Sequence, residues 1–97
     1  MNRNEIKLKL LNILTSLFST TGFDADILEY ADLIDDFGMD SITFISIVID
    51  IESVFEITVP DHMLFLENFR NVDGIIEIIE YAKNVDEENI SEQEAMK

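Results

Sequence analysis

A serine preceded by an aspartate, at the expected start of a helix, is the feature of this sequence best suited to chemistry. The residues Gly38-Met39-Asp40-Ser41-Ile42 lead directly into an apolar, helix-patterned segment. A helix N-terminus offers unpaired N–H groups and a positive dipole end, so a phosphodiester on Ser41 would be stabilised there. Gly38 allows another molecule to approach the backbone closely. Asp40 offers a negative charge to a basic partner or a metal ion.

The same Asp-Ser pair also fits a purely structural role. Serine and aspartate are both favoured N-caps, so either Asp40 or Ser41 could simply cap the helix. Phe44 stands three positions after Ser41, where a capping box would place a glutamate or glutamine. The pair alone therefore leaves both readings open, and the surrounding elements have to decide between them.

Apolar residues spaced three and four apart predict three main helices. The long connection between the first two should contain a helical turn, because long loops in compact domains often carry small elements. Pro60 should separate the second helix from a short third one. We therefore expect an all-α, four-helix bundle with three main helices, a short third helix and a long first loop. The main helices are predicted at about 4–18, 41–55 and 72–82, the turn within 25–34, and the third helix at 62–67.

The ends and inner faces of these helices can also be predicted. Asn2 or Asn4 is expected to cap the first helix, and Asp73 is expected to cap the last. Gly22 is expected to break the helical structure after the first helix. After Lys83 the helical pattern dissolves, which divides the chain into a domain at 1–83 and an acidic, flexible C-terminal tail at 84–97. Outside the second helix, the residues expected to face the core are Ile6, Leu8, Leu10, Leu11, Ile13, Leu14, Leu17, Phe18, Ile27, Leu28, Leu33, Ile34, Val72, Ile75, Ile76, Ile79 and Tyr81.

The second helix carries two apolar stripes, although a surface helix needs only one. The longer stripe contains both phenylalanines of the helix, and we assign it to the core. The other should face a partner, a cavity or a packed neighbour. The core stripe consists of Phe44, Ile47, Val48, Ile51 and Phe55, and the second stripe of Ile42, Ile45 and Ile49.

The charge balance points to protein partners. The 97 residues, one domain in length, include 21 acidic and 6 basic side chains, for a formal net charge of -15. Such a surface repels nucleic acid and anionic lipid, and it attracts proteins with basic patches. The N-terminus does not resemble a signal peptide, and no apolar run approaches the roughly 18 residues of a membrane span. We expect a cytoplasmic monomer without nucleic acid or membrane partners.

The chain is poor in residues that catalyse reactions or bind metals. It has no cysteine, and His62 is its one histidine. A serine nucleophile needs a base within reach, and a zinc site needs several soft or imidazole ligands. The acids Asp32, Asp35 and Asp36 suit a solvated face better than a metal site. We therefore expect neither an enzyme nor a specific metal site.

Three stretches together resemble the acyl carrier protein family over roughly residues 5–82. They are Gly38-Met39-Asp40-Ser41-Ile42, Phe55-Glu56-Ile57-Thr58-Val59-Pro60-Asp61 and Asn71-Val72-Asp73. The resemblance implies that a phosphopantetheinyl transferase attaches 4'-phosphopantetheine from coenzyme A to Ser41, with Asp40 and Gly38 beside it. Acyl or aminoacyl groups would then be carried as thioesters between enzymes with basic docking patches. The implied partner surface consists of Ile42, Ile45, Ile49, Asp50 and Glu52.

The second helix also departs from the family pattern. Thr43, Ser46 and Ser53 stand where fatty-acid carriers commonly have acids, and Phe37 replaces the usual leucine before Gly38. These differences favour a specialised carrier, for polyketide, nonribosomal-peptide or cell-surface acyl chemistry. Two alternatives remain open: a general fatty-acid carrier, and an unmodified acidic adaptor on the same fold.

Overall fold

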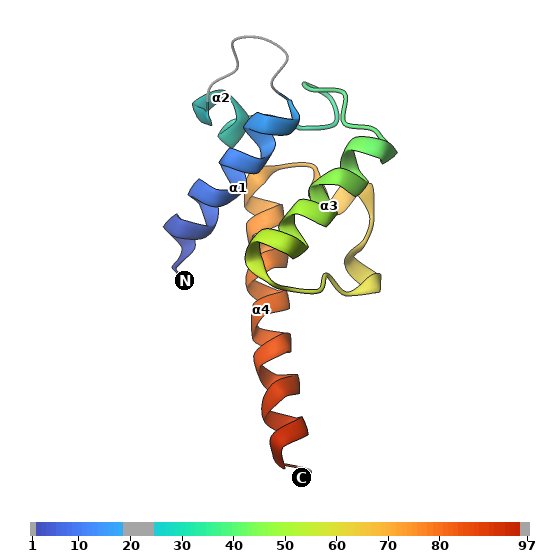
Figure 1. Ribbon diagram of the computed structural model, residues 1–97. Coiled ribbons are helices and arrows are strands. Elements are labelled where there is room, and N and C mark those ends of the chain that lie inside the picture. The colour runs from blue at the N-terminus through green and yellow to red at the C-terminus, as the bar shows by residue number, and fades with distance from the viewer. Residues whose placement is uncertain (1, 19–24, 96–97) are drawn as a thin grey trace.

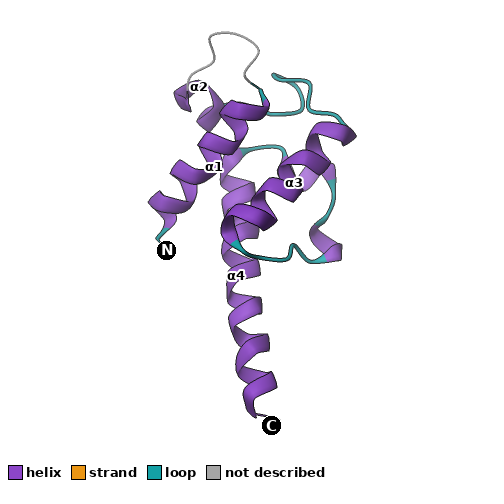
Figure 2. Ribbon diagram, viewed as in Figure 1, coloured by secondary structure: helices purple, strands orange, loops and turns teal. Residues whose placement is uncertain are grey.

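The computed structural model describes residues 2–18 and 25–95, and the side chains of residues 2–18 and 27–85. This part of the chain is helical and contains no strand, which confirms the predicted all-α bundle (Figure 2). The predicted break at Gly22 lies outside the described residues. The elements are α1 (Arg3–Leu17), α2 (Ala25–Tyr30), α3 (Ser41–Phe55), the 3₁₀ turns η1 (Asp61–Met63) and η2 (Leu66–Phe69), and α4 (Val72–Ala95).

The three long helices form the body of the bundle. α1 packs against both α3 and α4, and α2 packs against α1 (Figure 1). The segment that follows α3 returns alongside it, and η2 contacts both α3 and α4. The core draws on all of these elements, and its fully buried side chains are Leu10, Leu14, Leu28, Leu33, Ile47, Ile51, Phe69, Val72, Ile75, Ile76 and Ile79.

α1 begins after Asn2, which settles the choice between two predicted caps. The Asn2 side chain accepts a hydrogen bond of 2.9 Å from the backbone N–H of Glu5. Leu8 was predicted to widen the inner stripe but is 64% exposed, because it lies two positions, about 200°, from buried Ile6 on the helix. Ile27 in α2 is likewise largely exposed, contrary to prediction, while its neighbour Leu28 is fully buried.

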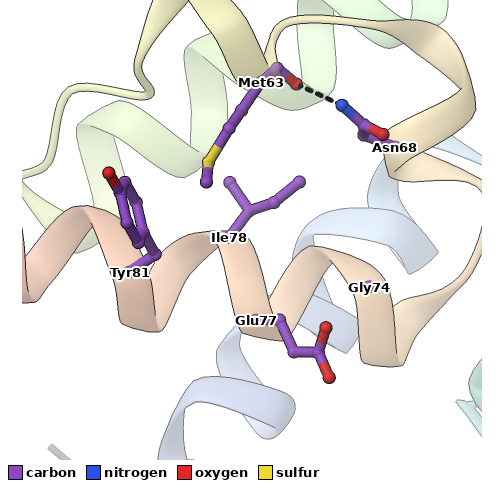
Figure 3. A pocket seen from close by; sticks show the side chains of 6 residues that line it. All are labelled: Met63, Asn68, Gly74, Glu77, Ile78 and Tyr81. Carbon is purple, nitrogen blue, oxygen red and sulfur yellow. Dashed lines mark hydrogen bonds between the residues drawn. The ribbon is translucent and has the colours of Figure 1, made fainter.

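The single third helix predicted at 62–67 is wrong. Two 3₁₀ turns take its place, because Phe65 between them has extended backbone angles that no helix continues through. The side-chain amide of Asn68 donates to the backbone oxygen of Met63 and so joins the two turns (Figure 3). Elements this short are decided by such tertiary contacts more than by their own pattern.

α4 differs from the prediction at both ends. Asn71, not Asp73, is the N-cap, since its side-chain oxygen accepts the N–H of Gly74 at 2.7 Å. The helix continues to Ala95, past its predicted end at Ala82, in a stretch without proline or glycine. Tyr81 is 42% exposed and Ile78 is buried instead. A flexible tail from residue 84 stays a prediction. Within the described ranges, every helix falls short of the length and apolar character needed to cross a membrane.

Candidate functional site

Ser41 is the first residue of α3, and its side chain is exposed. Asp40 is the N-cap of the helix, because its side-chain oxygen Oδ1 accepts the backbone N–H of Thr43 at 2.9 Å. Over the described part of the chain, no hydrogen bond involves the Ser41 hydroxyl. The capping role therefore belongs to Asp40, and the Ser41 hydroxyl remains available for chemistry.

Asp40 places a negative charge directly beside this hydroxyl. The pKa of its carboxyl is lowered, first by the hydrogen bond from the Thr43 backbone N–H and then by the Thr43 hydroxyl. The positive end of the α3 dipole favours the same charged form. Asp40 is therefore ionised at neutral pH, next to the exposed serine.

The chain reaches Ser41 through a turn at Gly38. Gly38 has a φ of +65°, a left-handed conformation that favours glycine, and a side chain there would meet only open space. The N–H groups of Gly38 and Met39 donate to the backbone oxygens of Ile34 and Leu33, both at 3.0 Å. Met39 is buried. The turn thus buries the residue before Asp40 and leaves Asp40 and Ser41 outside.

The loop before this turn is fastened to the segment before α4. The N–H of Leu33 donates to the backbone oxygen of Arg70 at 2.7 Å. The Arg70 guanidinium forms ion pairs with Asp32, at 3.0 Å, and with Glu67, at 3.2 Å. The loop that leads to α3 is therefore joined to Arg70, which lies between η2 and α4.

Two of the acids that were predicted to form a solvated face also shape this loop. Asp32 accepts the backbone N–H groups of Ile34 and Asp35, and Asp36 accepts the N–H of Asp32 at 2.9 Å. Aspartates that accept nearby backbone N–H groups stabilise turns in this way. The spacing of Asp32 and Asp36 was the available signal for this role, and sequence reasoning missed it.

The second isoleucine stripe of α3 lies on the surface beside Ser41. Ile42 is 77% exposed, Ile45 54% and Ile49 58%. Large exposed apolar side chains on a monomer are unremarkable singly, but a contiguous group of them indicates an interaction surface. The structure brings these three predicted partner residues together on one face.

The two acids of the predicted partner surface lie to either side of this stripe. The half-buried Glu52 accepts the backbone N–H of Val59 at 2.9 Å and so holds the segment that follows α3. Asp50 lines a pocket of about 360 Å³ between α1 and α3, together with Lys9 and Val54. The stripe itself is thus apolar rather than acidic.

Comparison with known families shows the family to which the chain belongs. Residues 12–79 match the family model described as the phosphopantetheine attachment site. The chain belongs to this phosphopantetheine attachment family. No curated protein matches the chain. The match runs from the last turns of α1 through the first turns of α4, and it confirms the resemblance to acyl carrier proteins.

The protein is accordingly a carrier of covalent 4'-phosphopantetheine. Such a domain interacts with a phosphopantetheinyl transferase and with biosynthetic enzymes that use the arm. The start of α3 has the chemistry that the group needs: an exposed hydroxyl that no described residue engages in a hydrogen bond, and a helix N-terminus that favours a phosphodiester.

A larger pocket of the carrier, about 470 Å³, lies between the two 3₁₀ turns and α4 (Figure 3). Met63 points toward Ile78 and Tyr81 there, and none of the lining residues comes from α3. The His62 ring packs edge-on against Tyr81, with ring centroids 6.1 Å apart. This pocket is therefore separate from the face that carries Ser41.

Proposed function

We propose that Ser41 bears the phosphopantetheine arm, and that the protein delivers acyl or aminoacyl groups, held as thioesters on that arm, between biosynthetic enzymes. The observation that carries this proposal is the exposed Ser41 hydroxyl at the first residue of α3, which takes no part in capping the helix. The chain has no cysteine, so the thiol that forms the thioester comes from the arm.

The neighbours of Ser41 have distinct roles in this proposal. Asp40 fixes the start of α3 and offers its charge to the transferase or to the magnesium ion that accompanies coenzyme A. Open space surrounds the position that a Gly38 side chain would occupy, so the transferase can approach the backbone there. The protein itself carries the cargo and leaves catalysis to its partners.

The partner enzymes dock on the face of α3 that starts at Ser41. Ile42, Ile45 and Ile49 supply apolar contact area there. Asp50 contributes a negative charge beside these isoleucines. Glu52 accepts the backbone N–H of Val59 and so holds the segment after α3 against the helix. The net charge of -15 attracts basic docking patches and raises the association rate.

We further propose that the carrier acts as a cytoplasmic monomer in a specialised pathway, for polyketides, nonribosomal peptides or cell-surface acyl groups. The support is the composition of the exposed face of α3, where Ser46 and Ser53 occupy positions at which acids would serve a general fatty-acid carrier. Elongation assays with a purified general fatty-acid synthase set test this point. Efficient elongation on this carrier would contradict a specialised role and favour a general fatty-acid carrier.

The attachment site is tested by intact mass after incubation with coenzyme A, magnesium and a broad-specificity phosphopantetheinyl transferase. We expect a gain of one phosphopantetheine on the natural protein and none on Ser41→Ala. Ser46→Ala is the matched control, because it removes a hydroxyl from the same helix and should leave the gain intact. A folded protein that gains no mass with several transferases would favour the unmodified adaptor.

A further inference from the structure

An apolar acyl chain attached near Ser41 has two ways to leave water: into the bundle, or onto a partner enzyme. This inference deepens the proposed function and rests on attachment at Ser41. One route into the bundle runs beneath the first turn of α3, where the side chain three positions on lies next to Ser41. That side chain is Phe44, which belongs to the inward-facing stripe.

Two aromatic rings fill this entry. The half-buried Phe44 packs against Phe69 of η2, with ring centroids 5.0 Å apart and the planes inclined by 66°. Phe69 is completely buried, and so is Ile47, one turn further along α3. Aromatic pairs in this edge-to-face arrangement are stabilised beyond the area that they bury. An acyl chain that entered beneath the first turn of α3 would have to separate the two rings before it could reach the core.

The position of Phe69 is itself fixed by its surroundings. η2 packs on both α3 and α4, and the next residue, Arg70, accepts the N–H of Leu33. The ion pairs of Arg70 with Asp32 and Glu67 connect the loop before α3 to η2. A displacement of the Phe69 ring would therefore disturb contacts on three sides, and closely packed interiors resist such shifts.

We propose that Phe44 and Phe69 close the interior of the bundle to the cargo, so that the acyl chain stays outside the carrier. The thioester then remains open to solvent and to partner enzymes at all chain lengths. A carrier of this kind suits short or polar acyl groups, which lose little by remaining in water, better than long alkyl chains.

The test compares how well the protein protects a short and a long thioester. Acetyl- and octanoyl-phosphopantetheine are loaded onto the natural protein, intact mass verifies the loading, and hydroxylamine cleavage is timed against the free acyl-pantetheines. We expect the octanoyl and acetyl rates, each relative to its free reference, to agree within about twofold, because no methylene group leaves water. On Phe44→Ala, the octanoyl ester should become about tenfold more resistant than the acetyl ester, since burial of two methylene groups is worth about that factor.

The controls separate this inference from the attachment proposal. Phe65→Ala removes a ring that is 59% exposed in the same segment and should behave as the natural protein does. If the Phe44→Ala variant does not fold, Phe44→Val replaces it in the test, because valine opens a smaller gap. Strong octanoyl protection on the natural protein, with shifted NMR signals for the Ile47 methyl groups, would overturn the inference, as would variants of Phe44 that give no protection. A failure to load at all would instead overturn attachment and, with it, this inference.

Discussion

Both faces of α3 carry isoleucines, and the isoleucines of the two faces differ in their surroundings. Ile47 and Ile51 on the inner face are fully buried, whereas Ile42, Ile45 and Ile49 on the outer face are at least half exposed. Both groups lie within a single helix of 15 residues. The difference is one of position around the helix and not of residue type.

This contrast shows how an apolar side chain can be assigned a role. An isoleucine on the inner face gains free energy by leaving water when the chain folds. On the outer face, the same side chain gains less from folding, and the part that stays exposed leaves water only when a partner covers it. Stability should therefore depend on the inner face, and transfer between enzymes on the outer one.

The largest expected effect comes from a truncation on the inner face. Ile51→Ala should lower the free energy of unfolding by about 2–5 kcal/mol, because it leaves a cavity in a packed core. Ile49→Ala, its matched control on the outer face, should change that free energy by less than about 0.5 kcal/mol. Urea unfolding followed by circular dichroism measures both variants. Equal losses for the two would contradict the division between the faces.

The outer face should show its effect in partner kinetics instead. Ile45→Ser should slow modification by the phosphopantetheinyl transferase about tenfold, since an apolar anchor in an interface is typically worth more than about 1 kcal/mol. The urea midpoint should not fall. Leu8→Ser on α1, where the leucine is 64% exposed against 54% for Ile45, controls for general loss of apolar surface. A comparable slowing in that control would mean that the outer face of α3 is not the docking surface.

The two faces could be predicted because their signal is local. Periodicity within α3 separates Ile51 from Ile49 without any knowledge of the other helices. What periodicity missed depends on contacts that are distant in sequence. Two 3₁₀ turns replace the predicted third helix, and the Glu52 side chain accepts the backbone N–H of Val59. Both features depend on contacts that form only when the chain folds. Tyr81 was expected to face the core but is 42% exposed, and Ile78, for which no position was predicted, is buried.

The left-handed residue at the C-terminal end of α3 should show a smaller effect. Glu56 has a φ of 54°, and the N–H of the following Ile57 reaches back to the backbone oxygen of Glu52. Glycine adopts this conformation without strain, so Glu56→Gly should raise the free energy of unfolding by about 0.5–1 kcal/mol. Glu56→Gln removes the same charge but keeps the strained side chain. If both variants stabilise equally, relief of charge repulsion and not of strain is the cause.

The smallest effect belongs to the N-terminal end of α3 and depends on pH. The folded protein lowers the pKa of Asp40, so the unfolded chain binds this proton more readily. The stabilisation is present above the unfolded pKa of about 3.9 and is lost as the pH falls through the folded value. Asp40→Asn keeps a capping side chain but does not titrate. Urea midpoints of the two proteins should therefore converge in acid, and parallel midpoints from pH 7 to pH 3 would contradict this.

The site was more predictable than its supports. The sequence identified the Asp40–Ser41 pair but left open which of the two residues caps the helix, because both are favoured caps. The hydrogen bond from Thr43 to Asp40 answers that question. The connection through Arg70, which joins the loop before α3 to η2, was not predicted, since its partners are far apart in sequence.

Because Asp40 rather than Ser41 caps α3, a group added to the Ser41 hydroxyl breaks no hydrogen bond among the residues that the structure describes. We therefore expect the bare protein and its loaded forms to share one shape. An enzyme that must distinguish an empty carrier from an acylated one then finds no difference in the conformation of the protein. It has to read the end of the arm itself, so discrimination between loading states is a task for the active sites of the partners.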